Sequence, residues 1–199
     1  MKYTDESILE ILNEAEKLQS IEHLGEKPIR IGGRYYEFVQ KAFFNDKLLL
    51  WMPDDFEDMP EQARKVKYPY EQRPEIIKSD ETGAIAFTLN VIDQELEDDW
   101  VQELVDGTKS AFKNMNPGHV FYSEGVDDVH GKKVGYLEFK SPGMDGFLYQ
   151  IMYFFEFEGR TGMGTFSCPY KEYADWKDVA FRIIRELVVI EEKEGEEAL

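Results

Sequence analysis

The sequence has only one cysteine, Cys168, among its 199 residues. A single thiol cannot form a disulfide within the chain, and it cannot supply a metal site built from several cysteines. Because Cys168 stands just before Pro169 on a stretch of alternating polarity, we expect a small buried hydrophobic residue rather than a nucleophile. A chain without internal disulfides suits a reducing compartment, so we expect a cytoplasmic protein.

Long hydrophobic runs are also missing. The longest, Leu48–Met52 and Ile151–Phe155, have five residues each, whereas a helix needs roughly 20 to cross a bilayer. The opening residues Met1–Glu6 are polar and do not begin the apolar segment of a secretory signal. We therefore predict a protein that does not interact with membranes.

Positive charge is scarce. Lysine and arginine number 23 against 41 aspartates and glutamates, which leaves a net charge of −18. Nucleic-acid binding depends on cations that displace counterions from phosphates, so this composition argues against a nucleic-acid partner. Anionic membrane surfaces are disfavoured for the same reason. The charge either keeps the protein in solution or offers an acidic face to a basic protein partner.

The common signatures of enzyme chemistry are absent as well. The sequence has no phosphate loop, no dinucleotide-binding glycine fingerprint, no serine nucleophile elbow and no zinc-protease helix motif. His23, His119 and His130 lack the spacing of metal ligands. Asp127 and Asp128 beside His130 could in principle hold a divalent cation, but we favour a solvated hairpin turn. We predict no cofactor, no metal and no catalytic residue, and we favour a protein that is not an enzyme.

The sequence does contain enough apolar material for a core. Hydrophobic residues make up 42% of the chain and include 14 Phe, 11 Tyr and 3 Trp. A chain of this length and composition forms one domain without needing disulfides.

Hydrophobic periodicity indicates both helices and strands. It predicts helices at residues 5–21, 93–115 and 175–188, a hairpin at 30–44 around Gly32-Gly33, and strands at 47–52, 83–92, 119–124, 133–140, 147–158 and 162–168. Short turns between the last four strands favour an antiparallel meander. The locally basic stretch 64–78 contains Pro69 and Pro74, so we expect it to be extended and irregular.

The strand at 147–158 is apolar on both of its alternating faces. Tyr149, Ile151, Tyr153 and Phe155 share one face, whereas Leu148, Met152 and Phe154 share the other. A strand of this kind is covered on both sides, so we predict that it lies between two helical layers. Trp176, at the start of the last helix, is predicted to anchor the core.

Several segments resemble the Mog1/PsbP/DcrB-like superfamily, most closely its DcrB-like bacterial branch, over roughly residues 46–190. They are residues 48–56 (LLLWMPDDF), 68–70 (YPY) with Arg73-Pro74, 83–90 (GAIAFTLN), 165–169 (TFSCP) and the amphipathic run 176–187. The resemblance implies an α+β fold, an α/β/α sandwich with a central, mainly antiparallel sheet. Residues 1–45 would then be an N-terminal helix-and-hairpin extension packed on the core, 46–190 the Mog1/PsbP-like domain, and 191–199 an acidic tail.

Members of this superfamily have protein binding in common rather than catalysis, so the resemblance implies a protein-binding adaptor or a chaperone-like module. We predict an interface formed by the stiff aromatic loop and the acidic loop before it. Its residues are Tyr68, Tyr70 and Arg73 with Asp54, Asp55 and Asp58. Two alternatives remain: a hydrolase or small-ligand-binding protein with a cleft built from distant residues, and a homo-oligomer assembled through residues 1–45.

Overall fold

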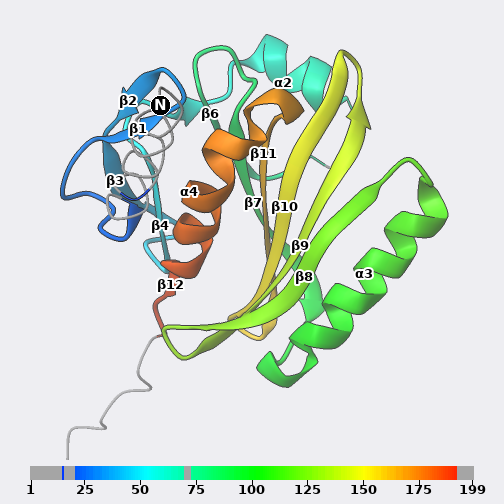
Figure 1. The fold of residues 1–199 in the computed structure, drawn as a ribbon. Helices are drawn as coiled ribbons and strands as arrows, with labels where there is room; N and C mark the ends of the chain where they lie inside the picture. The colour runs from blue at the N-terminus through cyan, green and yellow to red at the C-terminus, as the bar shows by residue number, and fades with distance from the viewer. Residues whose placement is uncertain (1–14, 16–20, 70–72, 192–199) are drawn as a thin grey trace, which may run out of the picture.

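The computed structural model describes residue 15, residues 21–69 and residues 73–191. Within these residues the chain forms a seven-stranded antiparallel sheet, a three-stranded sheet and a two-stranded hairpin (Figure 1). The helix predicted at residues 5–21 lies almost entirely outside them. None of the helices in the described ranges is both long and apolar enough to cross a membrane.

The large sheet has the order β5, β6, β7, β11, β10, β9, β8. These strands are β5 (Glu57–Asp58), β6 (Ile76–Ser79), β7 (Ala86–Glu95), β8 (Val120–Val129), β9 (Lys132–Gly143), β10 (Gly146–Phe157) and β11 (Arg160–Pro169). The small sheet contains β3 (Phe38–Phe43), β4 (Leu48–Pro53) and β12 (Val188–Val189), and the hairpin contains β1 (Ile29–Ile31) and β2 (Arg34–Tyr36). The helices are α2 (Glu61–Lys67), α3 (Val101–Met115) and α4 (Tyr173–Arg185), with 3-10 turns η1 (Asp98–Trp100) and η2 (Tyr170–Glu172).

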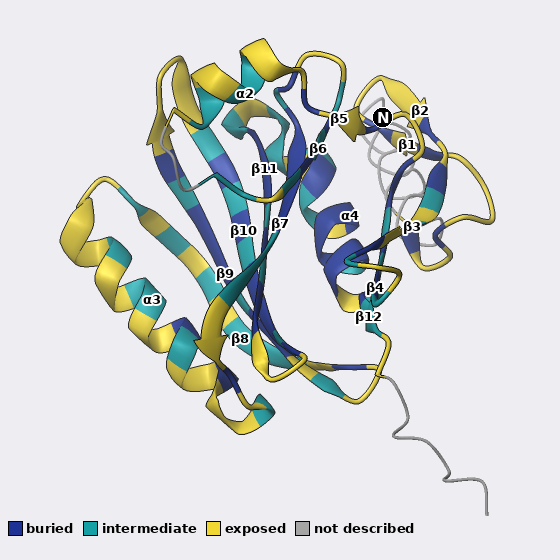
Figure 2. Cartoon of the chain, turned by 180° about the vertical axis from the view of Figure 1, so that it is seen from behind, coloured by how far each residue is buried: buried dark blue, intermediate teal, exposed yellow. Residues whose placement is uncertain are grey.

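The helices cover opposite faces of the large sheet. On one face, called the outer face here, α3 packs against β8, β9 and β10; in Figure 2, α3 and α4 lie on opposite sides of the strands, and α2 lies at the top. On the inner face α4 packs against β10 and β11, and its far side packs against β4 of the small sheet. The predicted α+β fold with a mainly antiparallel central sheet between helices is confirmed, and the small sheet adds a further layer beyond α4.

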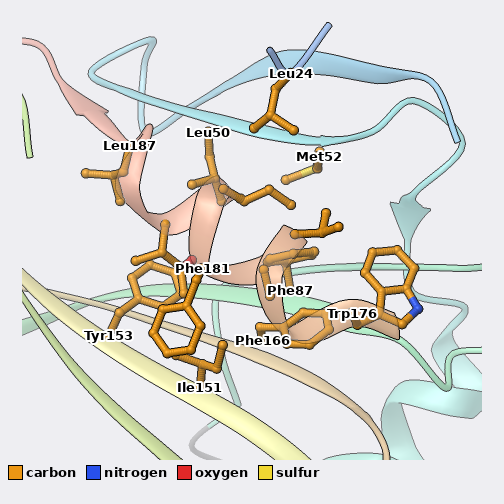
Figure 3. Close-up of a cluster of buried hydrophobic side chains, with 14 of the residues drawn as sticks. Leu24, Leu50, Met52, Phe87, Ile151, Tyr153, Phe166, Trp176, Phe181 and Leu187 are labelled. Carbon is orange, nitrogen blue, oxygen red and sulfur yellow. The ribbon is translucent and has the colours of Figure 1, made fainter. Parts of the chain in front are cut away.

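The core lies on the inner face, around α4. Trp176 is 2% exposed, as predicted, and its ring lies 5.1 Å from that of Tyr36 and 5.8 Å from that of Phe166. Figure 3 shows how apolar side chains from β4, α4 and the large sheet meet there. Cys168, also predicted to be buried, is fully enclosed, and burial raises the pKa of its thiol to about 12. A thiol in this environment is inert.

Strand β10 has helices on both of its faces, as its sequence predicts, although α3 covers only part of the outer face. Ile151, Tyr153 and Phe155 are at most 1% exposed on the inner face, and Phe154 is 3% exposed on the face that carries α3. Met152, also on the outer face, is half-buried. The predicted meander is confirmed too, because β8, β9, β10 and β11 pair in sequence order.

Two glycines of β11 make room for the aromatic rings of β10. Gly164 pairs with Tyr153 and Gly162 pairs with Phe155 across the antiparallel ladder. A Cβ atom at Gly164 would lie less than 3.0 Å from Cζ of Tyr153, and one at Gly162 would lie less than 3.0 Å from Cε2 of Phe155. Glycine in a strand weakens it unless something packs on the exposed backbone. Here the rings lie flat on β11, so the glycines are required by close packing.

Several boundaries differ from the predictions. The helix expected from Asp93 begins at Val101, because residues up to Glu95 continue β7 and pair with β11. Residues 57–58, expected in a loop, form β5 against β6. The last helix begins at Tyr173 rather than after an Asp175 cap, because η2 turns the chain directly out of β11.

The stretch 64–78 is not irregular throughout. Its first residues belong to α2, and residues 76–79 form β6. Pro69 restricts mainly the residue before it, so it ends α2 at Lys67 without preventing the preceding turns. Lys65 and Glu61 form an i, i+4 ion pair of 2.7 Å on this helix, and Pro60 precedes its first residue.

The predicted hairpin at 30–44 is divided between two sheets. β1 and β2 pair around Gly32-Gly33 as expected, but β3 turns away and pairs with β4. The predicted domain boundary at 45/46 therefore lies in the turn between β3 and β4. Ile29 and Phe38 share one core with Leu50. The division into an extension and a core domain stays a prediction.

The close packing at Gly164 gives a direct test. We expect Gly164→Ala to lower the free energy of unfolding by about 1–3 kcal/mol, because the new methyl group displaces Tyr153 from a dense core. Gly107→Ala in α3 is the matched control: it meets nothing within 4 Å, and alanine in a helix should raise the same free energy by about 0.5–1 kcal/mol. Urea titrations of both variants measure the difference, and equal effects would contradict the packing argument.

Candidate functional site

A groove runs along the inner face of the large sheet beside α4. Because α4 packs mainly on β10 and β11, the described residues leave part of the inner side of β8 and β9 accessible beside it. The groove, called the α4–β8 groove here, has a volume of about 500 Å³. Its floor includes Ser123, Tyr136 and Glu138, and its wall includes Lys177, Phe181 and Arg185.

Glu138 lies at the base of this groove and is 1% exposed. Its Oε1 accepts a hydrogen bond of 2.9 Å from the Tyr149 hydroxyl and pairs with Lys177 Nζ at 2.8 Å. Its Oε2 accepts a hydrogen bond from the Ser123 hydroxyl. A buried carboxylate is tolerated only when its oxygens are paired in this way. Burial, followed by the charge and hydrogen bond of Glu138, raises the pKa of Tyr149.

These contacts give Glu138 a structural role. The carboxylate accepts hydrogen bonds from one donor each on β8, β10 and α4. It therefore ties the α4 wall of the groove to the strands of its floor. It is enclosed and saturated with hydrogen bonds, which is not the condition of a general base waiting for a substrate proton. The cluster therefore fixes the shape of the groove.

An aromatic patch lies at one end of the groove. We call it the Tyr170 patch, and it consists of Val120, Tyr122, Lys140, Phe147 and Tyr170. Val120, Tyr122 and Phe147 are 49%, 43% and 51% exposed. The Tyr122 and Tyr170 hydroxyls are hydrogen-bonded at 2.9 Å, and Lys140 Nζ lies 4.0 Å from the ring centre of Phe147 and 4.2 Å from that of Tyr170. The patch combines exposed apolar area with a cation held between two rings.

The other end of the groove is formed by charged residues of α4. Arg185 Nε pairs with Asp127 at 2.7 Å, and its guanidinium lies 5.2 Å from the ring centre of Phe181. Arg182 pairs with Glu186 one turn later at 2.5 Å. Since each cation has an acidic neighbour, this end carries little net charge.

The residues considered for a divalent cation have other partners. Asp127 is engaged by the α4 guanidinium, and Asp128 pairs with Lys133 at 2.8 Å. His130 lies in the turn between β8 and β9, and its Nε2 is 3.5 Å from the carboxylate of Glu186. Across the described part of the chain, no group of three or more His, Cys, Asp or Glu side chains is arranged to hold a metal ion.

His130 lies beside the carboxylate of Glu186, whereas His119 has aromatic neighbours. The ring of His119 lies among aromatic residues under α3, 5.6 Å from the ring centres of Phe112 and Phe139 and 6.2 Å from that of Phe121. The hydrolase alternative depended on a pocket that holds His119 or His130 beside carboxylates, and these surroundings do not supply one for His119.

The acidic residues of the predicted interface lie near the hairpin and β6. Asp54 and Asp55 follow β4, and Asp55 pairs with Arg34 of the hairpin. Asp58 lies on β5, with its side chain 84% exposed, and pairs with Lys78 at 3.0 Å. Exposed pairs of this kind contribute little to stability. All three aspartates are exposed, so their carboxylates are accessible to a partner.

The aromatic loop of the predicted interface is only partly described. Tyr68 is half-buried and packs beside the cluster of Met59, Ile77 and Ala86. Burial raises the pKa of Tyr68 to about 12, and the Ser167 hydroxyl beside it lowers that pKa by less. Arg73 is half-buried, and Tyr70 lies outside the described residues. The predicted interface as a whole stays a prediction.

Neither the Glu138 cluster nor the Tyr170 patch was predicted from the sequence. One signal was present: Glu138 stands at an inward position of a predicted strand, where an unpaired charge would be costly. Its partners come from residues 11, 15 and 39 positions away, so only the fold could identify them.

Among comparisons with known proteins, those with solved structures bear on the fold. No family model matches the chain, and no curated protein matches it. Among solved structures, the cyanobacterial PsbP protein CyanoP from Synechocystis sp. PCC 6803 is 11% identical, with a TM-score of 0.56 over 80% of this chain and 96% of CyanoP. The Ran-binding protein Mog1p of Saccharomyces cerevisiae is 10% identical, with a TM-score of 0.45 over 78% of this chain and 97% of Mog1p.

A third solved structure, a Pseudomonas aeruginosa protein of unknown function described as a putative regulator, is 13% identical, with a TM-score of 0.48 over 78% of this chain and 99% of that protein. The likeness to CyanoP shows that the chain has a PsbP-like fold, which confirms the predicted resemblance at the level of the fold. At these identities the likeness concerns the fold alone.

Two tyrosines on the inner face of β10 give a test of the groove's base. Tyr149 donates to the buried Glu138, whereas the buried Tyr153 hydroxyl has no hydrogen-bond partner among the described residues. We expect Tyr149→Phe to lower the free energy of unfolding by about 2 kcal/mol and Tyr153→Phe to raise it by about 1 kcal/mol. Urea unfolding at neutral pH measures both. Two changes of the same sign would show that the hydroxyl environments are misassigned.

The buried Tyr68 predicts a dependence on alkaline pH. The folded state holds its proton more tightly than the unfolded chain, in which tyrosine titrates near pH 10.0. The resulting stabilisation is complete below pH 10 and is lost as the pH rises from about 10 to about 12. We expect Tyr68→Phe to make the free energy of unfolding fall less steeply across this interval in urea titrations. Tyr35→Phe, at a residue that is 66% exposed, controls for the loss of a phenol.

Proposed function

We propose that this chain, with its PsbP-like fold, is a non-enzymatic protein-binding module that acts as an adaptor or a chaperone-like protein. The observation that carries the proposal is the Tyr170 patch, where exposed Val120, Tyr122 and Phe147 surround a lysine held between two rings. Tyrosine and other large aromatic residues are the side chains that most often dominate the energy of protein interfaces.

The surroundings of the patch support an extended partner segment. Val120 and Tyr122 belong to β8, which forms the outer edge of the large sheet. A strand at a sheet edge has backbone groups free to pair with an added strand. A segment that pairs with β8 would place alternate side chains over the patch, so we propose that its inward residues are apolar.

The charge of the chain supports a basic partner. The whole chain has a net charge of −18, although Glu124, Asp127 and Asp128 of β8 are each paired with a lysine or arginine. Opposite charges raise the rate of encounter and disfavour acidic competitors. We therefore propose that lysine or arginine residues flank the apolar positions of the bound segment. We also propose that the protein works in the cytoplasm, since its one cysteine is buried and forms no disulfide.

The test begins with partners captured from the native lysate and continues with one purified partner. We expect Tyr122→Ala with Phe147→Ala to weaken binding of that partner at least about tenfold, because each truncation removes a central aromatic contact. Titration calorimetry of the purified pair measures the dissociation constant, and thermal melting verifies that the variant is folded.

The matched control removes exposed aromatic residues elsewhere. Tyr35→Ala with Trp100→Ala truncates side chains that are 66% and 46% exposed and lie outside the patch. The control should bind like the parent. If both double variants weaken binding equally, or if neither does, the Tyr170 patch is not the interface.

The interface predicted from the sequence is tested in the same assay. This interface consists of Tyr68, Tyr70 and Arg73 in the aromatic loop and Asp54, Asp55 and Asp58 in the acidic segment. The variants Arg73→Glu and Asp58→Lys each reverse one charge in it. If these reversals weaken binding and the double variant at Tyr122 and Phe147 does not, the partner binds the loops instead of the Tyr170 patch.

A further inference from the structure

The outer face of the large sheet has a gap in its helical cover. α3 covers β8, β9 and β10, while Ala63 and Tyr68, with Met59, pack near Ile77 and Ala86 at the other side. Figure 2 shows α3 and α2 at opposite sides of this face, with β10, β11 and β7 between them. The strands in the gap present Met152, Met163 and Ser167 to the outer face.

A cavity of about 280 Å³ occupies this gap. Tyr68 and Pro74 lie at its border, Met152 and Met163 supply apolar lining, and Thr165 and Ser167 supply hydroxyl groups. This volume is at the lower end of the range for ligand sites, so the cavity suits a molecule smaller than a typical drug. We call it the Ser167 pocket.

Ser167 is the polar group that marks the pocket as a site. It is 4% exposed, and its Oγ has no hydrogen-bond partner among the described residues. The Tyr68 hydroxyl lies near enough for Ser167 to lower its pKa, yet the two hydroxyl groups do not form a hydrogen bond of normal geometry. A buried hydroxyl without a partner costs free energy that a bound molecule can recover.

Among the described residues that line the pocket, none offers a free charge. Lys67 is the charged residue in its lining, and its Nζ donates to the carbonyls of Gly83 at 2.9 Å and Ala84 at 3.2 Å. Burial lowers the pKa of this amine. A charged ligand would lose its hydration without gaining a partner of opposite charge, so the lining favours a neutral one.

We propose that the Ser167 pocket binds a small uncharged molecule that has one flat apolar part and one hydroxyl or carbonyl group. The apolar part packs between Met152 and Met163, whose flexible thioethers adapt to a ring. The polar group exchanges a hydrogen bond with Ser167 Oγ. This site lies on the face of the sheet opposite to the Tyr170 patch, so it is independent of the proposed protein interface.

The test uses benzyl alcohol as the probe and the full chain labelled with ¹³C at the methionine methyl groups. We expect saturable shifts of the Met152 and Met163 methyl resonances, with none at Met144, which is 84% exposed in the turn between β9 and β10. Benzoate, which has a similar ring but carries a charge, should bind at least about tenfold more weakly. Absent or linear shifts, or equal affinity for benzoate, would overturn the proposal.

Two variants complete the test. Ser167→Ala should preserve the fold, because it removes a hydroxyl that has no hydrogen-bond partner among the described residues. It should weaken the binding of benzyl alcohol about three- to tenfold. Met163→Trp should fill the pocket and abolish the shift at Met152, with melting measured to verify folding. If benzyl alcohol binds both variants as it binds the parent, it does not occupy the Ser167 pocket.

Discussion

The burial of α4 between two sheets is the constraint on which the structure depends. Val179 is fully enclosed and Phe181 is only 8% exposed, although these two residues lie on opposite sides of the helix. One side meets β10 and β11, and the other meets β4. A surface helix needs only one apolar stripe, whereas a helix enclosed in this way needs apolar residues over most of its circumference. Trp176 joins the layers, because its ring reaches Tyr36 of the hairpin and Phe166 of the large sheet.

The same constraint creates the candidate site. A helix held against β10, β11 and β4 contacts β8 and β9 through only a few side chains, so a groove is left between it and these two strands. Glu138 lies where the groove begins, under the edge of α4, and its ion pair with Lys177 connects β9 to the helix. The Tyr170 patch occupies the end of the opening where η2 precedes the helix. The groove therefore follows from how the layers pack, and its residues determine what it binds.

Much of the sheet could be predicted from the sequence, because strand signals are local. The double apolar pattern of 147–158 and the turns around it were enough to place β8 to β11 in order. Predictions failed where long-range pairing overrode a local pattern, as at Asp93, which looks helical among acids but continues β7 against β11. The small sheet was missed because Val188 and Val189 become a strand only after α4 returns them to β4. The Glu138 cluster was missed for the same reason.

The glycine–aromatic pairs of β10 and β11 bear on how this fold varies in evolution. Tyr153 can keep its ring only while position 164 lacks a side chain, and Phe155 depends on position 162 in the same way. Neither partner can be exchanged alone without strain in the core. In related chains we therefore expect these positions to covary, with a larger residue at 164 accompanied by a smaller one at 153. Such coupled exchanges would trace common descent in sequences that have otherwise diverged beyond recognition.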